Sequence, residues 1–235
     1  MIELGERLTK VASFVPKDSK VCDVGSDHAY LPVYLNQNNQ ITSAVAGEVV
    51  EGPFLSAKQT VRDYRMEDRI EVRFGDGLQI LSKDDEITAI TICGMGGELI
   101  SRILEAGYSG GHLSGEERLI LQPNVAEHFV REWLMNHSYR ITHETVVEDN
   151  HRLYEIIVAE PVEERIEYTE LEIKYGPILL KEPSELSVAK WTRMNRKNKE
   201  ILEQLQKSKT PQHEKIEQFE KAFNELKGVI DRANS

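Results

Sequence analysis

Glycines and acidic residues follow four apolar stretches of the sequence, at the point where each stretch ends. The stretch Lys20–Val24 runs into Gly25, and the stretch Ile41–Glu48 ends on a carboxylate. In an open α/β sheet, ligands bind in the crevice outside the carboxyl ends of the strands. Glycine lets the backbone approach such a ligand, because it has no Cβ atom. The four strand ends predict a cofactor site made of Asp23, Gly25, Ser26, Asp27, Glu48, Asp76, Gly77, Gly94, Met95 and Gly96.

The acidic residues of this set predict how a nucleoside cofactor would be held. Glu48 is placed to accept hydrogen bonds from two ribose hydroxyls. Asp76 can accept a hydrogen bond from the exocyclic amine of adenine, and Gly77 adds no side chain to the wall of the site. Asp23 or Asp27 is available to the amino group of an amino-acid moiety.

A dinucleotide site would use the same glycine turn and the same acidic end of the second strand. Residues 25–30 lack the second and third glycines that a pyrophosphate needs. The carboxylate of Asp27 would also repel a phosphate at the N-terminus of a helix. S-adenosylmethionine carries no phosphate, so we favour it over a nicotinamide cofactor.

The order of the expected elements indicates the fold. Apolar residues at helical spacing predict a helix over residues 2–14. Strands and helices then alternate as far as residue 136, and two consecutive strands follow at 139–147 and 153–159. A dehydrogenase half-sheet would keep alternating. A terminal pair of strands is typical of class I methyltransferases, so we predict a Rossmann-like seven-stranded α/β sheet over residues 1–160.

A different pattern begins near Ser184. Apolar residues recur there at intervals of three and four, in two runs separated by Thr210-Pro211. This pattern predicts an antiparallel coiled-coil hairpin within a helical domain over residues 161–235. The expected seam contains Trp191, Met194, Asn198, Ile201 and Leu205 in the first run, and Ile216, Phe219, Phe223, Leu226 and Ile230 in the second.

Composition limits the class of protein. The chain has 235 residues, of which 40% are hydrophobic and 29% are charged, as in an ordinary globular protein. It has no signal-peptide pattern and no apolar stretch of about 18 residues, so we expect a cytoplasmic protein without membrane contacts. Cys22 and Cys93 lie in apolar runs and are expected to be buried thiols, and we expect no metal site.

The net charge of −11 argues against a generally basic nucleic-acid-binding surface. Residues 184–235 nevertheless contain 11 Lys and Arg against 8 Asp and Glu, a net charge of +3 that leaves −14 for residues 1–183. A run without acidic residues could be a solvated helix face or a surface that contacts phosphates. It contains Lys190, Arg193, Arg196, Lys197 and Lys199.

Three motifs resemble those of a known family. Asp23–Pro32 (DVGSDHAYLP), Ile92–Gly97 (ICGMGG) and Leu121–Asn124 (LQPN) are similar to the bacterial tRNA adenine-22 N1-methyltransferases, and the resemblance covers most of the chain. It implies methyl transfer from S-adenosylmethionine to N1 of an adenine in the D-arm region of tRNA. It also makes the basic run the expected tRNA-contacting surface. We expect a monomer that does not bind DNA.

N1 of adenine has a free lone pair at neutral pH, so this reaction needs alignment more than a strong base. N1 lies on the Watson–Crick edge, so the base must be unpaired and turned into the site. We expect His28, Tyr30 and Met95 to provide a stacking surface, and Gln122 and Asn124 to bind the adenine edge. Helix capping, core packing and strand termination are the structural alternatives for these residues.

Two other functions stay open on the sequence. The protein could be a methyltransferase that acts on another RNA or on a small molecule. It could also be a non-catalytic cofactor sensor whose hairpin is a protein-interaction coiled coil.

Overall fold

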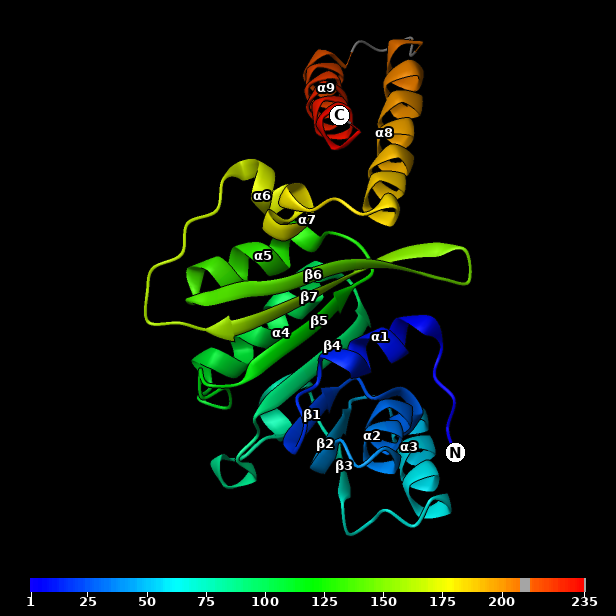
Figure 1. Ribbon diagram of the computed structural model, residues 1–235, viewed down its shortest axis with the longest axis vertical. Helices are drawn as coiled ribbons and strands as arrows, with labels where there is room; N and C mark the ends of the chain where they lie inside the picture. The colour runs from blue at the N-terminus through cyan, green and yellow to red at the C-terminus, as the bar shows by residue number, and fades with distance from the viewer. Residues whose placement is uncertain (208–211, 235) are drawn as a thin grey trace. The chain divides into compact units, whose positions relative to one another are not determined.

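The computed structural model describes residues 1–207 and 212–234, which fall into two compact units (Figure 1). The first unit spans residues 1–177 and the second spans residues 178–235. Every strand that the described residues form belongs to the first unit, and the second unit is helical.

The sheet of the first unit contains β1 (Ser19–Val24), β2 (Ile41–Glu48), β3 (Ile70–Phe74), β4 (Ala89–Met95), β5 (Arg118–Pro123), β6 (Tyr139–Asp149) and β7 (Arg152–Pro161). Their order is β3-β2-β1-β4-β5-β7-β6. The first five strands in the chain are parallel, and β7 lies antiparallel between β5 and β6. The predicted methyltransferase sheet is confirmed.

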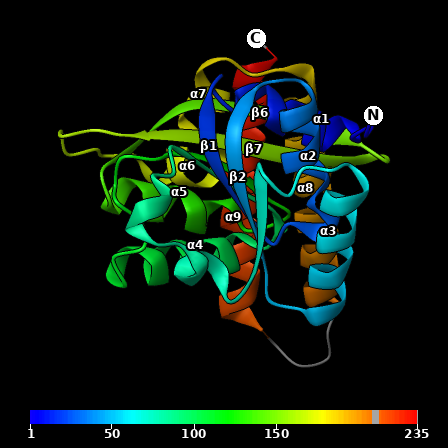
Figure 2. The same ribbon diagram turned by 90° about the horizontal axis from the view of Figure 1, so that it is seen from below.

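Helices cover both faces of this sheet (Figure 2). One face carries α1 (Glu6–Phe14), α2 (Tyr30–Gln37) and α3 (Glu51–Asp63), and the other carries α4 (Gly97–Ser109) and α5 (Glu127–Asn136). Val11, Val33 and Val61 of the first three helices share one core with residues of the strands. Because both faces are covered, Ile90 and Ile120 have no exposed surface, as is usual in parallel sheets.

α1 begins later than the sequence predicts, and a short turn precedes α2. α1 begins at Glu6, and the segment before it is extended at Gly5 and forms a 2.9 Å hydrogen bond from the backbone N–H of Ile2 to Oε1 of Gln37 on α2. The first crossover helix begins at Tyr30, after a short 3-10 turn. His28 and Ala29 have φ values of 60° and 54°, which a right-handed helix does not allow.

The first unit extends beyond residue 160, where the sequence predicts its end. The segment after β7 includes α6 (Glu170–Tyr175), and the guanidinium of Arg131 on α5 donates 3.3 Å hydrogen bonds to the carbonyls of Ile173 and Lys174. The Tyr168 hydroxyl accepts a 3.0 Å hydrogen bond from the backbone N–H of Ile141. These contacts attach residues 161–177 to the sheet unit.

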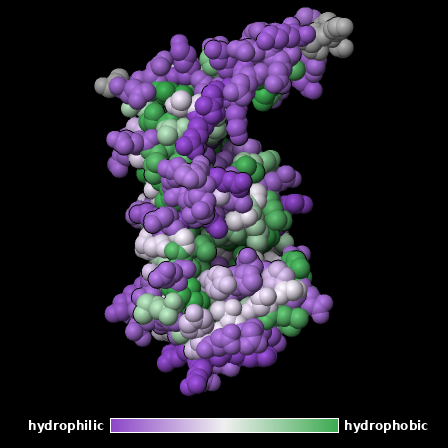
Figure 3. Space-filling view, turned by 90° about the vertical axis from the view of Figure 1, so that its right-hand side faces the viewer, coloured by the Kyte–Doolittle hydropathy of each residue, from purple (hydrophilic) through white to green (hydrophobic). Residues whose placement is uncertain are grey.

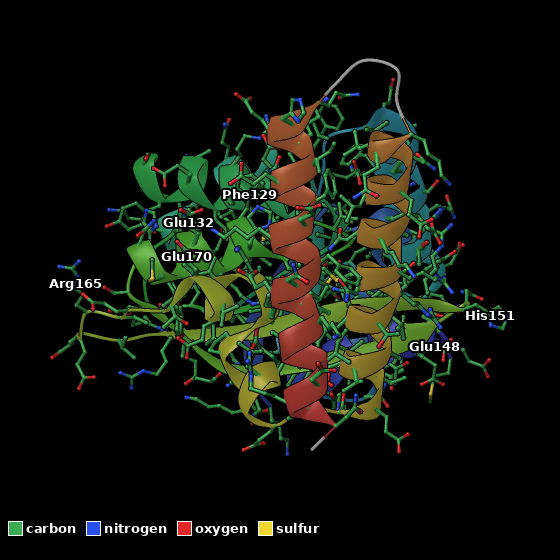
Figure 4. The ribbon with its side chains drawn as sticks, turned by 90° about the horizontal axis from the view of Figure 1, so that it is seen from above. Phe129, Glu132, Glu148, His151, Arg165 and Glu170 are labelled. Carbon is green, nitrogen blue, oxygen red and sulfur yellow. The ribbon has the colours of Figure 1, made fainter. Side chains whose placement is uncertain are left out.

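The second unit contains most of α7 (Pro177–Lys181), with α8 (Glu185–Gln206) and α9 (His213–Ala233). The face of this unit seen in the space-filling view is mostly hydrophilic (Figure 3). α8 and α9 lie side by side and run in opposite directions (Figure 4). This confirms a helical C-terminal region, while the coiled-coil packing stays a prediction. The turn predicted at Thr210-Pro211 lies outside the described residues.

The seam of the helix pair differs from the prediction on α8. The seam residues predicted on α9 are all buried or half-buried. On α8, Ile201 is 37% exposed, and its neighbour Leu202 is half-buried instead. Asn195, rather than Asn198, is the more buried asparagine. Ile201 and Leu202 are adjacent in the sequence, so residue spacing alone could not show which of the two is more buried.

We predict that the buried cluster around Arg131 stabilises the first unit. Its side chain is fully buried, its Nε donates a 2.7 Å hydrogen bond to Glu144, and its Nη2 pairs with Glu155. Arg131→Met would leave two buried carboxylates without their arginine, which costs about 3–5 kcal/mol. Urea unfolding followed by circular dichroism would measure this loss.

Arg140→Met is the matched control, because Arg140 pairs with Glu164 at 2.7 Å in a largely exposed position. Such surface pairs contribute at most about 1 kcal/mol. Equal losses in the two variants would contradict a special role for the buried cluster.

Candidate functional site

A cavity of about 480 Å³ lies at the carboxyl ends of β1, β2 and β4 and beside the loop after β3. Cavities of this size are typical of small-molecule and cofactor sites. Nine of the residues predicted from the sequence line it: Asp23, Gly25, Asp27, Tyr30, Glu48, Asp76, Gly77, Gly94 and Met95. Ser26, His28, Gly96, Gln122 and Asn124 are not among the lining residues.

Asp23 is a buried carboxylate near the end of β1, two residues before Gly25. It is 6% exposed, and its Oδ1 accepts a 2.6 Å hydrogen bond from the hydroxyl of Thr91 on β4. Burial raises the pKa of Asp23 to about 6, and the nearby Glu48 adds to the rise. A cation that approached this carboxylate would restore its charge and relieve the cost of burying it.

Glu48 is held rigidly at the end of β2. It is buried, and its Oε1 accepts hydrogen bonds from the backbone N–H groups of Val49 at 2.8 Å and Val50 at 2.9 Å. These groups precede α3, where a negative charge is favourable. With Oε1 engaged, Oε2 is the oxygen that can accept hydrogen bonds from a ligand in the cavity.

The loops after β1 and β4 approach each other closely. Gly25 has a φ of +69°, and a Cβ atom there would stand 2.2 Å from Cε of Met95. A larger residue would therefore be strained in its backbone and would also displace Met95. The positive φ is the stronger reason for glycine here, because the terminal methyl of Met95 is the end of a flexible side chain.

The end of β4 is braced by two side chains, one on β5 and one directly after it. Oε1 of Gln122 accepts a 3.0 Å hydrogen bond from the backbone N–H of Gly94, and Nδ2 of Asn124 donates a 2.7 Å hydrogen bond to its carbonyl. Nε2 of Gln122 also donates to Oδ1 of Asn124 at 3.1 Å. Gln122 is fully buried. The contacts with adenine that the sequence suggests for these two residues stay predictions.

Tyr30 and His28 form a stacked pair at the cavity. Their ring centroids are 5.1 Å apart, with an angle of 12° between the planes. Tyr30 lines the cavity and is 42% exposed, and Nε2 of His28 lies 3.3 Å from Oδ1 of Asp27. The pair offers an accessible aromatic surface at the point where the chain leaves β1.

Arg7 is a cavity residue that the sequence analysis missed. It lies on α1 and is the one Lys or Arg among the lining residues that the structure describes. Its Nη1 donates to Oε1 of Gln122, and its guanidinium carbon lies 5.4 Å from the ring centre of Tyr154. The helical spacing around it was visible in the sequence, but that spacing did not indicate which strand ends α1 would reach.

The predicted basic run lies on α8 of the second unit. Arg193, Arg196, Lys197 and Lys199 are exposed, while Lys190 is half-buried. Arg196 and Lys199 lie 3.8 Å and 3.9 Å from glutamates one turn further along the helix. Such exposed pairs are weak, so they leave the positive charge of the run largely accessible to solvent.

Residues 1–207 and 212–234 form no helix with the length and apolar character needed to cross a lipid bilayer.

Comparisons with known proteins show the family of this chain. A family model described as tRNA (adenine(22)-N(1))-methyltransferase matches residues 21–228. A Bacillus subtilis (strain 168) protein with the same description is 41% identical over 236 residues, which cover 98% of each chain.

Solved structures show the same fold over nearly the whole chain. The structure of the B. subtilis m1A22 tRNA methyltransferase has a TM-score of 0.90 and 39% identity, and the match covers 98% of this chain and 100% of that one. The structure of Streptococcus pneumoniae Sp1610, described as a putative tRNA (m1A22) methyltransferase in complex with S-adenosyl-L-methionine, has a TM-score of 0.87 and 40% identity, with the same coverage.

The family resemblance seen in the three sequence motifs is therefore confirmed, and this chain belongs to the tRNA (adenine(22)-N(1))-methyltransferase family.

Proposed function

We propose that this protein transfers the methyl group of S-adenosylmethionine to N1 of adenine 22 in tRNA. The observation that carries the proposal is the cavity at the strand ends, with the buried carboxylates of Asp23 and Glu48 beside a glycine loop. The curated B. subtilis relative, which is similar over 98% of this chain, is described by this activity. We place the reaction in the cytoplasm, where tRNA is processed in bacteria.

The donor set of the cavity fits S-adenosylmethionine. Oε2 of Glu48 is available to ribose hydroxyls, because Oε1 is already held by two backbone N–H groups. Asp76 and Gly77 follow β3 and suit the adenine moiety, and Asp23 suits the amino group of the methionine moiety. When bound, S-adenosylmethionine supplies a methyl group on a positively charged sulfur atom.

The acceptor adenine is expected beside Tyr30. Because N1 already has a free lone pair, the residues of the site need only stack, orient and shield the base. The exposed ring of Tyr30 and the stacked ring of His28 offer a surface for a base that has left its helix. Positive charge moves onto the base during transfer, and Asp27 next to His28 is placed to stabilise it.

The basic run on α8 supports binding of tRNA phosphates. Phosphate contacts position a nucleic acid without reading its sequence, so this run would supply affinity rather than the choice of adenine 22. We propose that the protein acts as a monomer.

The direct test is methylation of unmodified tRNA with labelled S-adenosylmethionine, followed by mapping of the methylated nucleotide. We expect one label at N1 of adenine 22, and no label on a tRNA in which this adenine is replaced by guanine. Label at another nucleotide, or only on a non-tRNA acceptor, would favour the other methyltransferase functions. Binding of the cofactor without any methyl transfer would favour the sensor.

We predict that Tyr30→Ala slows methyl transfer without weakening cofactor binding. Loss of base stacking typically costs about 1–3 kcal/mol, so we expect a single-turnover rate about 10- to 100-fold lower. Tyr64→Ala is the control, because Tyr64 is also partly exposed but does not line the cavity. An unchanged rate for Tyr30→Ala would exclude the stacking role.

We predict that binding of S-adenosylhomocysteine weakens in acid. The pKa of Asp23 is about 6, so its carboxylate is charged above this pH and becomes neutral below it. If the charged form binds the ligand amino group, the affinity is constant above about pH 7 and falls about tenfold per pH unit well below pH 6.

Isothermal titration calorimetry between pH 5 and pH 8 would measure this profile. Asp23→Asn should bind S-adenosylhomocysteine weakly at every pH, and its affinity should no longer fall below pH 6. Asp27, His28 and Glu48 are unchanged in this variant. If the affinity of Asp23→Asn still falls in acid, the titrating group is one of those three residues instead.

We predict that reversing three exposed charges on α8 weakens tRNA binding. The variant carries Glu in place of Arg196, Lys197 and Lys199, and its matched control carries Glu in place of Lys215, Lys221 and Lys227, which are exposed on α9. Affinity falls as salt concentration rises, and each lost phosphate contact makes the slope of log affinity against log salt concentration less steep by about 0.9. Equal effects in both variants would indicate a general charge effect rather than contacts on α8.

A further inference from the structure

The cavity is strongly acidic except at Arg7. Four carboxylates line it, from Asp23, Asp27, Glu48 and Asp76, and Arg7 is its one lining cation among the described residues. S-adenosylmethionine has a zwitterionic amino-acid moiety, so an acidic cavity alone would attract its amino group and repel its carboxylate. We propose that Arg7 binds the carboxylate of the methionine moiety. This inference rests on the proposed function.

The fold separates two ends of the cavity. Leu99 and Ile103 enter from α4 on one face of the sheet, and Ile103 packs within 3.0 Å of the position that a Cβ atom at Gly77 would take. Arg7 and Leu8 enter from α1 on the opposite face. The apolar end beside Asp76 and Gly77 suits adenine, which leaves the end at Arg7 for the amino-acid moiety.

Arg7 is next to the strand ends that would hold this moiety. Its Nη1 lies 3.6 Å from where a Cβ atom at Gly94 would stand, and its charge lowers the pKa of the Cys93 thiol, although burial, the larger effect, raises that pKa. Gly94 and Cys93 belong to β4, which pairs with β1 at Asp23. The amino group and the carboxylate of the ligand would therefore meet opposite charges on neighbouring elements.

The guanidinium is oriented but has donors left for a ligand. One Nη1 hydrogen bond goes to Gln122, and the ring of Tyr154 lies 5.4 Å from the guanidinium carbon. Arg7 forms no ion pair with a carboxylate within the described residues. A guanidinium has five N–H donors, so it can hold Gln122 and still bind a carboxylate with two parallel hydrogen bonds.

The structural alternative is that Arg7 serves only as a brace for Gln122 and the loop at Gly94. Two ligands separate these roles. S-adenosylhomocysteine and 5′-methylthioadenosine share the nucleoside and a thioether, but 5′-methylthioadenosine has no amino acid. A carboxylate contact affects the first ligand alone, whereas a brace that shapes the cavity affects both.

The experiment is isothermal titration calorimetry of both ligands with the wild-type chain, Arg7→Gln, Arg7→Lys and Lys10→Gln. We expect Arg7→Gln to bind S-adenosylhomocysteine about 10- to 100-fold more weakly, because a hydrogen-bonded charge is lost. Its affinity for 5′-methylthioadenosine should stay within about twofold of wild type. Lys10 lies on the same helix outside the cavity lining, so Lys10→Gln should change neither affinity.

Arg7→Lys keeps the charge and carries the test if Arg7→Gln does not fold. It should lose less affinity for S-adenosylhomocysteine than Arg7→Gln and none for 5′-methylthioadenosine. Equal loss for both ligands, or no loss for either, would overturn the proposal. Failure of the wild-type chain to bind S-adenosylhomocysteine would instead count against the proposed function, so the two failures are distinguishable.

Discussion

The hydrogen bonds around Gly94 hold together the elements that form the cavity. The N–H and the carbonyl of this residue are engaged by Gln122 and Asn124, and Gln122 also accepts a hydrogen bond from Arg7 on α1. Residues of α1, of β5 and of the loop after β5 thus meet at the end of β4. Because both its N–H and its carbonyl are engaged by side chains, this backbone unit is held in one position. Gly25 can approach Met95 closely only because the loop after β4 is held in this place.

The electrostatics of the cavity favour a ligand with positive charge. Burial makes Asp23 costly to ionise, and Glu48 is tied to the start of α3, so both carboxylates gain from a ligand that supplies hydrogen-bond donors or positive charge. A phosphate would be repelled by these carboxylates. The excess of acid in the first unit is therefore compatible with a cationic, phosphate-free methyl donor. Positive charge for the phosphates of tRNA is available on α8 of the second unit.

Stability and function are carried by different polar clusters of the first unit. Arg131, Glu144 and Glu155 form a fully buried group away from the cavity lining, and Arg131 also holds the segment that contains α6. This group explains why the first unit continues past residue 160. Residues at the cavity, by contrast, include the exposed ring of Tyr30 and a partly exposed Arg7, which are positions that a ligand can reach.

The sequence by itself determined the sheet, the helical C-terminal region and nine of the nineteen residues that line the cavity. Strand ends in a parallel sheet must meet at one edge, so local patterns at Gly25, Glu48 and Gly77 were enough to place residues together. Only the tertiary structure decided the roles open to Gln122 and Arg7. The side chains that bind Gly94 are 28 and 30 residues away in the sequence, and Arg7 is 115 residues from Gln122, so these contacts depend on how separate segments pack. Residue spacing within one segment carries no information about such contacts.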